Sequence, residues 1–148
     1  MSDWIDLHAL WQVVLVGLIF GAGLPALLSM LSANMDGIYR SLESAHFNGK
    51  LVVVNYYSLD YADAAGTGLT QLLNQAIASH AAADGAIVAD AFTAFQQASA
   101  SASGHTCAAG LLNALPGSQF TCDVHPSQSG QQLLAETVAN TYDAATGN

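Results

Sequence analysis

The chain has 148 residues, about the length of one domain, and 52% of them are hydrophobic while 9% are charged. Arg40 and Lys50 are its only arginine and lysine residues, against eleven carboxylates, and the net charge is -9. Nucleic-acid binding is therefore not expected, because phosphate contacts need lysine and arginine. The same shortage of basic residues weighs against electrostatic binding to anionic lipid.

Residues 1–35 form an apolar N-terminal segment. Between Leu7 and Met35 there is no Asp, Glu, Lys or Arg, and the run "ALWQVVLVGLIFGAGLPALLSML" is long enough to cross a bilayer as a helix. A cleaved signal peptide is the main alternative, but the preceding "MSDWID" carries two acids and no base, the reverse of the usual pattern. A buried helix of a soluble domain is the third alternative. We expect a transmembrane helix in residues 1–35 that anchors residues 36–148 to a membrane.

Beyond Met35 the sequence alternates between helical and strand-like patterns. "IYRSLESAHF" predicts a helix that is closed by Gly49, and "LVVVN" and "GAIVAD" are short apolar runs typical of strands buried on both faces. "GLTQLLNQAIASHAAA" and "SGQQLLAETVANTY" predict amphipathic helices. "AFTAFQQASA" predicts a loop or a short helix, and "SASASG" and "GLLNALPGSQFTC" predict loops. This order predicts an α/β fold with parallel strands, although two strands do not make a stable sheet alone.

Cys107 and Cys122 lie in the loop-rich part of the chain. They would form a disulfide in an exported domain, and would be free thiols or metal ligands in a cytosolic one. With His105 and His125 they also form an H-x-C pair and a C-x-x-H pair, whose side chains are of the types that zinc prefers. The residues alone leave these alternatives open.

The segment "CDVHPSQSGQQ" places Asp123 and His125 directly before the terminal helix. A positioned imidazole can take a proton from a serine hydroxyl when a carboxylate or a carbonyl fixes its tautomer. Pro126 restricts the histidine before it to extended or turn conformations, which would present the ring from a loop. The structural alternative is an ordinary helix start, with Pro126 in the first turn and Ser127 or Ser129 as the cap. Spacing alone favours this alternative, because Asp-x-His is a common accident.

Longer segments resemble a known family. "CDVHPSQSGQQLLA" resembles the C-terminal block of SGNH (GDSL-type) hydrolases, in which Asp, His and Pro precede a glycine and a helix. "GKLVVVNYYSLDYAD" and "LTQLLNQAIASHAAADGAIVADAFTAF" are similar to the central strand, loop and helix of secreted actinobacterial members. The resemblance covers roughly residues 36–142. It implies part of a flavodoxin-like three-layer α/β/α fold, and hydrolysis of an ester or lipid substrate through a serine nucleophile.

The resemblance also assigns roles to individual residues. It implies that His125 is the general base and that Cys107 and Cys122 form a disulfide rather than a zinc site. The usual family spacing puts the catalytic Asp three residues before the His, where this chain has Cys122. The partner of His125 is therefore expected to be either Asp123 or the main-chain carbonyl of Cys122.

Two observations bear on which side of the membrane the C-terminal part lies, and they disagree. Arg40 and Lys50 follow the apolar segment, which favours the cytoplasmic side by the positive-inside rule. A disulfide favours the outside of the cell. We expect the extracytoplasmic side.

The front half of the family pattern is missing. The sequence has no Gly-Asp-Ser motif, no G-x-N-D and no G-x-S-x-G elbow, and Ser127 and Ser129 follow the histidine too closely to be its partners. A base without a nucleophile does not make a serine hydrolase, so little or no activity is expected from this chain alone. A partner chain that completes the sheet is expected, and no metal or cofactor. The alternative function is that of a non-catalytic, membrane-anchored binding or structural protein.

Overall fold

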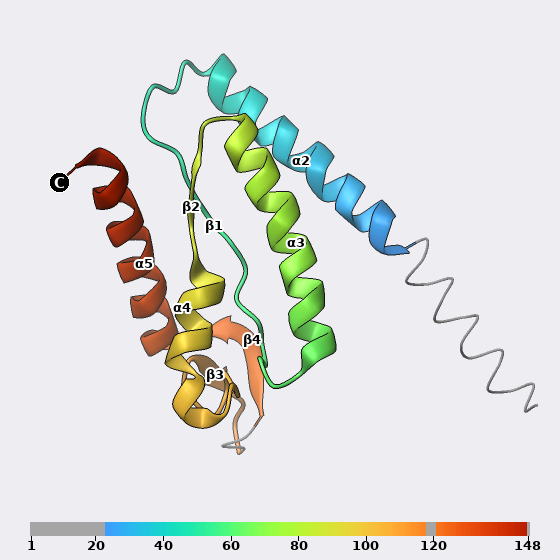
Figure 1. Cartoon of the computed structure of the whole chain (residues 1–148), viewed down its shortest axis with the longest axis vertical. Helices are drawn as coiled ribbons and strands as arrows, with labels where there is room; N and C mark the ends of the chain where they lie inside the picture. Colours follow the sequence, from blue (N-terminus) through green and yellow to red (C-terminus); the bar gives the residue numbers. More distant parts are fainter. Residues whose placement is uncertain (1–22, 118–120, 148) are drawn as a thin grey trace, which may run out of the picture. The chain divides into compact units, whose positions relative to one another are not determined.

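The structure, a computed structural model, describes residues 23–117 and 121–147 (Figure 1). The chain divides into two compact units, Met1–Ala45 and His46–Asn148. The described part of the first unit is one long helix, so the boundary predicted after residue 35 falls inside that helix. The described part of the second unit combines helices with short strands.

The helix of the first unit, α2, spans Leu24–Ser44. Pro25 occupies its first turn, a position that suits proline because no backbone N–H is needed there. Only residues 24–35 of the apolar run lie in this helix, fewer than the ~20 that a bilayer requires, and the helix then continues through Asp36 and Arg40. No helix in the described residues is long and apolar enough to cross a membrane. The predicted transmembrane helix is therefore wrong for these residues, and residues 7–22 of the expected span lie outside the part that the structure describes.

Two short parallel strands organise the second unit. β1 (Val52–Val54) pairs with β2 (Ile87–Ala89), and α3 (Ala64–Ala83) connects them. The C-terminal helix α5 (Gln128–Thr146) contacts both strands, and α3 contacts β2 (Figure 1). The parallel pairing was predicted, because continuous apolar runs suit strands that lie between helices.

The remaining elements follow β2. α4 (Ala91–Ala98) starts immediately after the strand, packs against α5 and buries Phe95 completely. A short 3-10 turn, η2 (Ala100–Ala102), then leads into the loop that carries Cys107.

Each helix of this unit begins at a side-chain cap. Asp63, Asp90 and Ser127 are the N-caps of α3, α4 and α5, and each accepts a hydrogen bond from a backbone N–H of the first turn. Ser127 is thus one of the two caps that the sequence predicted.

An antiparallel hairpin replaces the loops predicted around the second cysteine. β3 (Leu112–Ala114) pairs with β4 (Cys122–Pro126), and the two form a sheet separate from β1 and β2. Polar and apolar residues alternate in β4, but the strand is too short for this pattern to distinguish it from a loop in the sequence. Its extended conformation depends on the pairing with β3.

The predicted partial three-layer α/β/α fold is also wrong. The described residues form a small α/β unit that is mostly helical, with two separate two-stranded sheets. A three-layer fold needs one broad sheet between its helices, and two apolar runs supply only one parallel pair.

Gly130, in the first turn of α5, lets this helix approach the loop before β3. A Cβ at this position would meet the carbonyl oxygen of Leu111 and would lie 3.0 Å from the Pro126 Cβ. The Leu111 oxygen also accepts a hydrogen bond of 2.9 Å from the Ser127 N–H. The backbone of Leu111 therefore fixes the start of α5, and a side chain at position 130 would push the two apart.

We predict that Gly130→Ala lowers the free energy of unfolding by about 1–3 kcal/mol, because overpacking forces the backbone to move. Gly68→Ala is the matched control, since a Cβ on Gly68 in α3 meets no atom within 4 Å. This control should raise stability by about 0.5–1 kcal/mol through its helix propensity. Urea unfolding followed by circular dichroism measures both. Equal effects of the two substitutions would contradict the close approach at Gly130.

Candidate functional site

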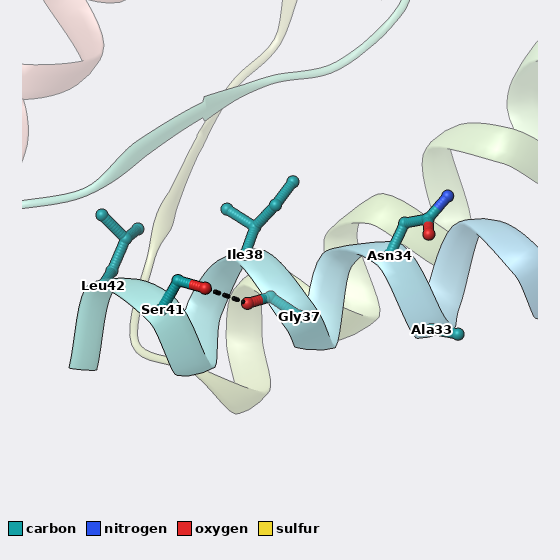
Figure 2. A pocket seen from close by; sticks show the side chains of 6 residues that line it. All are labelled: Ala33, Asn34, Gly37, Ile38, Ser41 and Leu42. Atoms are coloured by element: carbon teal, nitrogen blue, oxygen red, sulfur yellow. Dashed lines mark hydrogen bonds between the residues drawn. The ribbon is translucent and has the colours of Figure 1, made fainter. Parts of the chain in front are cut away.

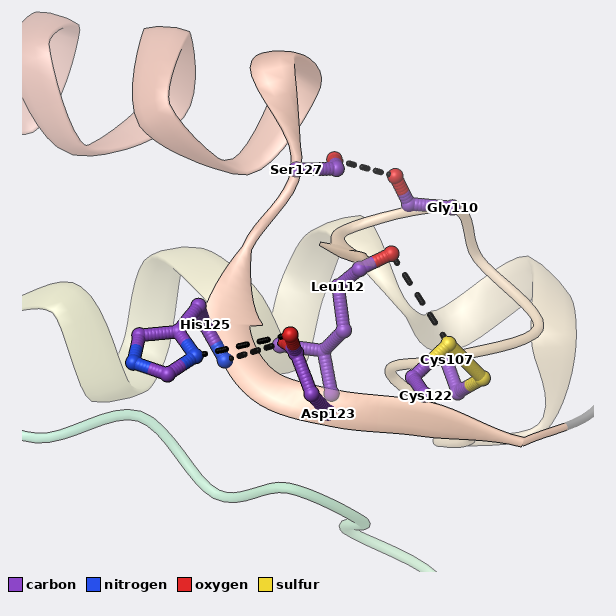
Figure 3. Close-up of a disulfide and its surroundings, with 7 residues drawn as sticks. All are labelled: Cys107, Gly110, Leu112, Cys122, Asp123, His125 and Ser127. Atoms are coloured by element: carbon purple, nitrogen blue, oxygen red, sulfur yellow. Dashed lines mark hydrogen bonds and ion pairs between the residues drawn. A yellow bond between two sulfur atoms is a disulfide. The ribbon is translucent and has the colours of Figure 1, made fainter. Parts of the chain in front are cut away.

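The structure brings Asp123 and His125 together at the end of β4 (Figure 3). Asp123 Oδ1 accepts a hydrogen bond of 2.8 Å from the His125 backbone N–H, and Asp123 Oδ2 lies 3.5 Å from His125 Nδ1. The His125 side chain is 73% exposed and that of Asp123 is 38% exposed. The carboxylate thus faces one ring nitrogen, while solvent reaches the rest of the imidazole. No hydrogen bond from His125 to the Cys122 carbonyl occurs among the described residues.

Both ends of β4 are tied to the loop in front of β3. A disulfide joins Cys122 to Cys107, with an S–S distance of 2.04 Å (Figure 3). The Cys122 sulfur also lies 3.7 Å from the Leu112 carbonyl oxygen, a contact without a shared proton because a disulfide sulfur carries none. At the other end the Ser127 hydroxyl donates to the Gly110 carbonyl at 2.6 Å. These links position the segment that carries His125.

Tyr57, three residues beyond β1, connects the parallel sheet to this segment. Its hydroxyl donates to the Val124 carbonyl at 2.8 Å, and its ring stacks on Phe95 with 4.2 Å between the centroids. Burial, and secondarily the negative charge of Asp123, raise the pKa of Tyr57 above its ordinary value. Tyr57 therefore stays protonated and keeps donating to the strand beside His125.

No described serine is hydrogen-bonded to His125. The Ser127 hydroxyl bridges the Gly110 carbonyl and the Gly130 N–H, where it caps α5. Ser58 is buried and bonds to the Asp60 carbonyl and to Thr67. The described residues thus provide a candidate base, and the hydroxyl of Ser127, two residues further along the chain, has a structural role.

A second histidine–carboxylate pair was not predicted. His105 Nδ1 lies 3.1 Å from Asp60 Oδ2, and both side chains are about half exposed. Because 45 residues separate the two, no local motif marks the pair. The disulfide also removes the zinc site considered for His105 and His125, since neither cysteine is free to bind a metal as a thiolate.

The carboxyl ends of β1 and β2 form a polar edge. The Asn55 amide donates to Asp90 Oδ1 at 2.9 Å and accepts from the Phe92 N–H at 3.0 Å. Partial burial raises the pKa of Asp90, but hydrogen bonds from Thr93, Asn55 and Phe92 outweigh it and leave the pKa below its ordinary value. The Asn55 side chain is thus held within the protein by its oxygen and by one of its two N–H groups.

A hollow of about 370 Å³ lies over this edge, between the polar side of α3 and the start of α4. Asn74, on its α3 side, accepts from the Tyr56 N–H at 2.8 Å and donates to the Tyr56 carbonyl at 2.7 Å. These two hydrogen bonds satisfy the backbone N–H and carbonyl of the second residue beyond β1. The loop after β1 is thus held by side chains from α3.

A further hollow lies on α2 (Figure 2). Its lining residues all belong to this one helix: Ala33, Asn34, Gly37, Ile38, Ser41 and Leu42. The Ser41 hydroxyl donates to the Gly37 carbonyl at 2.8 Å, one helical turn back. A single helix face does not enclose a ligand, and none of the residues that line this hollow has a titratable side chain.

Comparisons of the chain with descriptions of protein families, with curated protein sequences and with solved structures gave no match.

Tyr61 holds the loop between β1 and α3 against α4. Its hydroxyl donates to the Phe92 carbonyl at 2.6 Å and accepts from the Ser58 N–H at 3.1 Å, and its ring meets that of Phe92 edge to face. Burial raises the pKa of Tyr61 to about 12, although the bond from Ser58 works in the opposite direction. The neutral phenol is the form that donates to Phe92, so its contribution to stability is full below pH 10 and is lost as the pH rises through 12.

We predict that Tyr61→Phe removes from the ultraviolet titration a phenol that ionises near pH 12. The same substitution should lower the free energy of unfolding at neutral pH by about 1–3 kcal/mol, because it leaves the part-buried Ser58 N–H without the hydroxyl that accepts its hydrogen bond. Tyr142→Phe, at an exposed position of α5, is the control and should change neither. A high-pH phenol that persists in Tyr61→Phe would contradict the assignment.

Proposed function

We propose that residues 46–148 are the base-carrying C-terminal portion of an SGNH-type ester hydrolase. In this proposal His125 is the general base for an ester or lipid substrate, and Asp123 is its partner. The observation that carries the proposal is the 3.5 Å approach of Asp123 Oδ2 to His125 Nδ1, directly before α5. A carboxylate on one ring nitrogen leaves the other nitrogen as the proton acceptor.

The surrounding links support this role. The disulfide at Cys122 and the cap at Ser127 restrict the two ends of the five-residue strand that carries the pair. Tyr57 adds a third attachment at Val124, between the two proposed catalytic residues. A base must be held in place to be effective, because misplacement by about 1 Å costs on the order of 100-fold in rate.

The exposure of His125 sets a limit on what the chain does alone. An ion pair in contact with solvent contributes about 0–1 kcal/mol and orients its members weakly. The serine nucleophile and the oxyanion donors would have to come from a partner chain that also covers the imidazole. We therefore propose that the isolated chain carries a competent base and does not turn over esters as a serine hydrolase.

The test of the base uses p-nitrophenyl acetate, an activated ester that an accessible imidazole can cleave by itself. We predict that His125→Ala lowers the rate for the full chain several-fold and that Asp123→Asn lowers it less, because the ring remains and only its orientation is lost. His105→Ala is the matched control, since this histidine also pairs with a carboxylate but is less accessible to the ester, with a side chain 52% exposed against 73% for His125. A rate that His125→Ala leaves unchanged would remove His125 from the mechanism and favour a non-catalytic binding protein.

The test of the missing nucleophile uses a fluorophosphonate probe, which labels activated serines. We expect no labelling of the folded chain, because no described serine is hydrogen-bonded to His125 and the Ser127 hydroxyl caps α5. Labelling that disappears in His125→Ala would show that the chain contains its own activated serine. In that case the proposal that the chain is incomplete would be wrong.

A further inference from the structure

The hollow over the polar edge of the parallel sheet is lined by three separate parts of the chain. One is Asn55, just after β1, and a second is the start of α4 with its cap: Asp90, Phe92 and Thr93. The third is one face of α3, with lining residues at helical spacing: Gln71, Asn74, Gln75 and Ala78. The volume of about 370 Å³ lies within the range of about 300–1,000 Å³ that is usual for small-molecule sites. In open parallel sheets, ligands bind at this end of the strands.

Several amide groups of this lining are free to bind a ligand. In the part of the chain that the structure describes, the side chains of Gln71 and Gln75 make no hydrogen bond, and both residues are exposed. Asn55 donates one of its two N–H groups to Asp90, and no described residue accepts the other. Amide nitrogens are donors and amide oxygens are acceptors. The hollow therefore offers free donors and free acceptors together.

The charge of the lining works against ionic ligands. Asp90 is the one ionisable residue among those that line the hollow, and hydrogen bonds from Thr93, Asn55 and Phe92 keep its pKa below the ordinary value. Its carboxylate is thus ionised at neutral pH and repels anions, and no lysine or arginine lines the hollow to offset it. A cation would find this carboxylate already hydrogen-bonded to three residues, and it would leave the free amide N–H groups without an acceptor.

We propose that this hollow binds one neutral sugar ring, either a free monosaccharide or the end unit of a glycan. A hydroxyl group both donates and accepts, so a hydroxyl-rich ring can pair with the amides of Gln71 and Gln75 and with the free N–H of Asn55. Phe92 and Ala78 offer an apolar contact to the C–H face of the ring. This proposal goes beyond the hydrolase proposal and does not depend on it.

The arrangement of the free groups favours a sugar over other neutral ligands. They come from α3 on one side and from the end of β1 on the other, and a sugar ring carries hydroxyls around its whole rim. A planar nucleobase would need a free aromatic face, whereas Phe92 is 9% exposed and its ring already meets that of Tyr61 edge to face. An apolar ligand would displace water from the amides without replacing its hydrogen bonds, and would lose affinity.

NMR titration of the full chain with D-glucose tests the site. We expect the side-chain NH₂ signals of Asn55, Gln71 and Gln75 to shift with a dissociation constant of about 1–10 mM, because a small ligand in an open polar site binds weakly. Sodium phosphate, an anionic probe, should shift none of these signals. Glucose concentrations well above this range that leave the signals unchanged would overturn the proposal, and so would binding of phosphate in place of glucose.

Substitutions at exposed positions locate the site without disturbing the fold. Gln71→Ala combined with Gln75→Ala should weaken glucose binding about ten-fold or more, because two amides that bond the ring are lost. Gln97→Ala is the matched control, since Gln97 is an exposed amide of α4 outside the lining and should leave the affinity unchanged. An affinity that the double substitution does not reduce would overturn the proposal.

Two further measurements complete the test. Maltotriose distinguishes the two sources of the ring, because binding at least as tight as that of glucose indicates the end of a glycan and weaker binding indicates a free monosaccharide. Cleavage of p-nitrophenyl acetate by the Gln71→Ala, Gln75→Ala double variant should equal that of the wild type. The sugar site and the proposed role of His125 can therefore each fail without the other.

Discussion

The parallel ladder between β1 and β2 is three residues long on each strand, and the positions of the polar groups of the second unit depend on it. Parallel strands end at the same edge, so the ladder places Asn55 beside Asp90 although 35 residues separate them. The Asn55 amide oxygen then accepts a hydrogen bond from the Phe92 N–H at the start of α4. The side-chain amide of Asn74 in α3 bonds to both the N–H and the carbonyl of Tyr56. The loops at this edge are fixed because their polar groups have found partners inside the protein.

The proposed site at His125 is held in a different way. It lies on the antiparallel β3–β4 pair, and a disulfide, the Ser127 cap and the close approach at Gly130 bind this pair to the start of α5. These attachments restrain the backbone, whereas the imidazole itself faces solvent. A rigid backbone with an exposed base is consistent with a half-site that a second protein surface would complete.

The hydrophobic composition of the chain is reflected in the apolar side chains on its surface. A chain with 52% hydrophobic residues and 9% charged residues has little polar side-chain material with which to cover a small unit. Large apolar side chains are consequently exposed on α2, on β1 and on α3, including Leu27, Val54 and Leu72. Exposed apolar surface that adjoins an unpaired strand edge is typical of an interaction site. The proposed function accordingly involves another chain.

The sequence by itself determined the local elements of the second unit. Apolar runs predicted β1 and β2, 3.6-residue periodicity predicted α3 and α5, and Ser127 was correctly named as a candidate cap, because these features depend on residues close together in the chain. The extent of the sheet, the β3–β4 pairing and the His105–Asp60 pair were not predictable, since they depend on contacts between distant residues. The apolar N-terminal run predicted a membrane span, but hydropathy does not show where a helix begins, and α2 starts within that run and continues into charged residues. Only the tertiary structure decided that Asp123 faces His125, because the pairing of β4 with β3 sets the direction of both side chains.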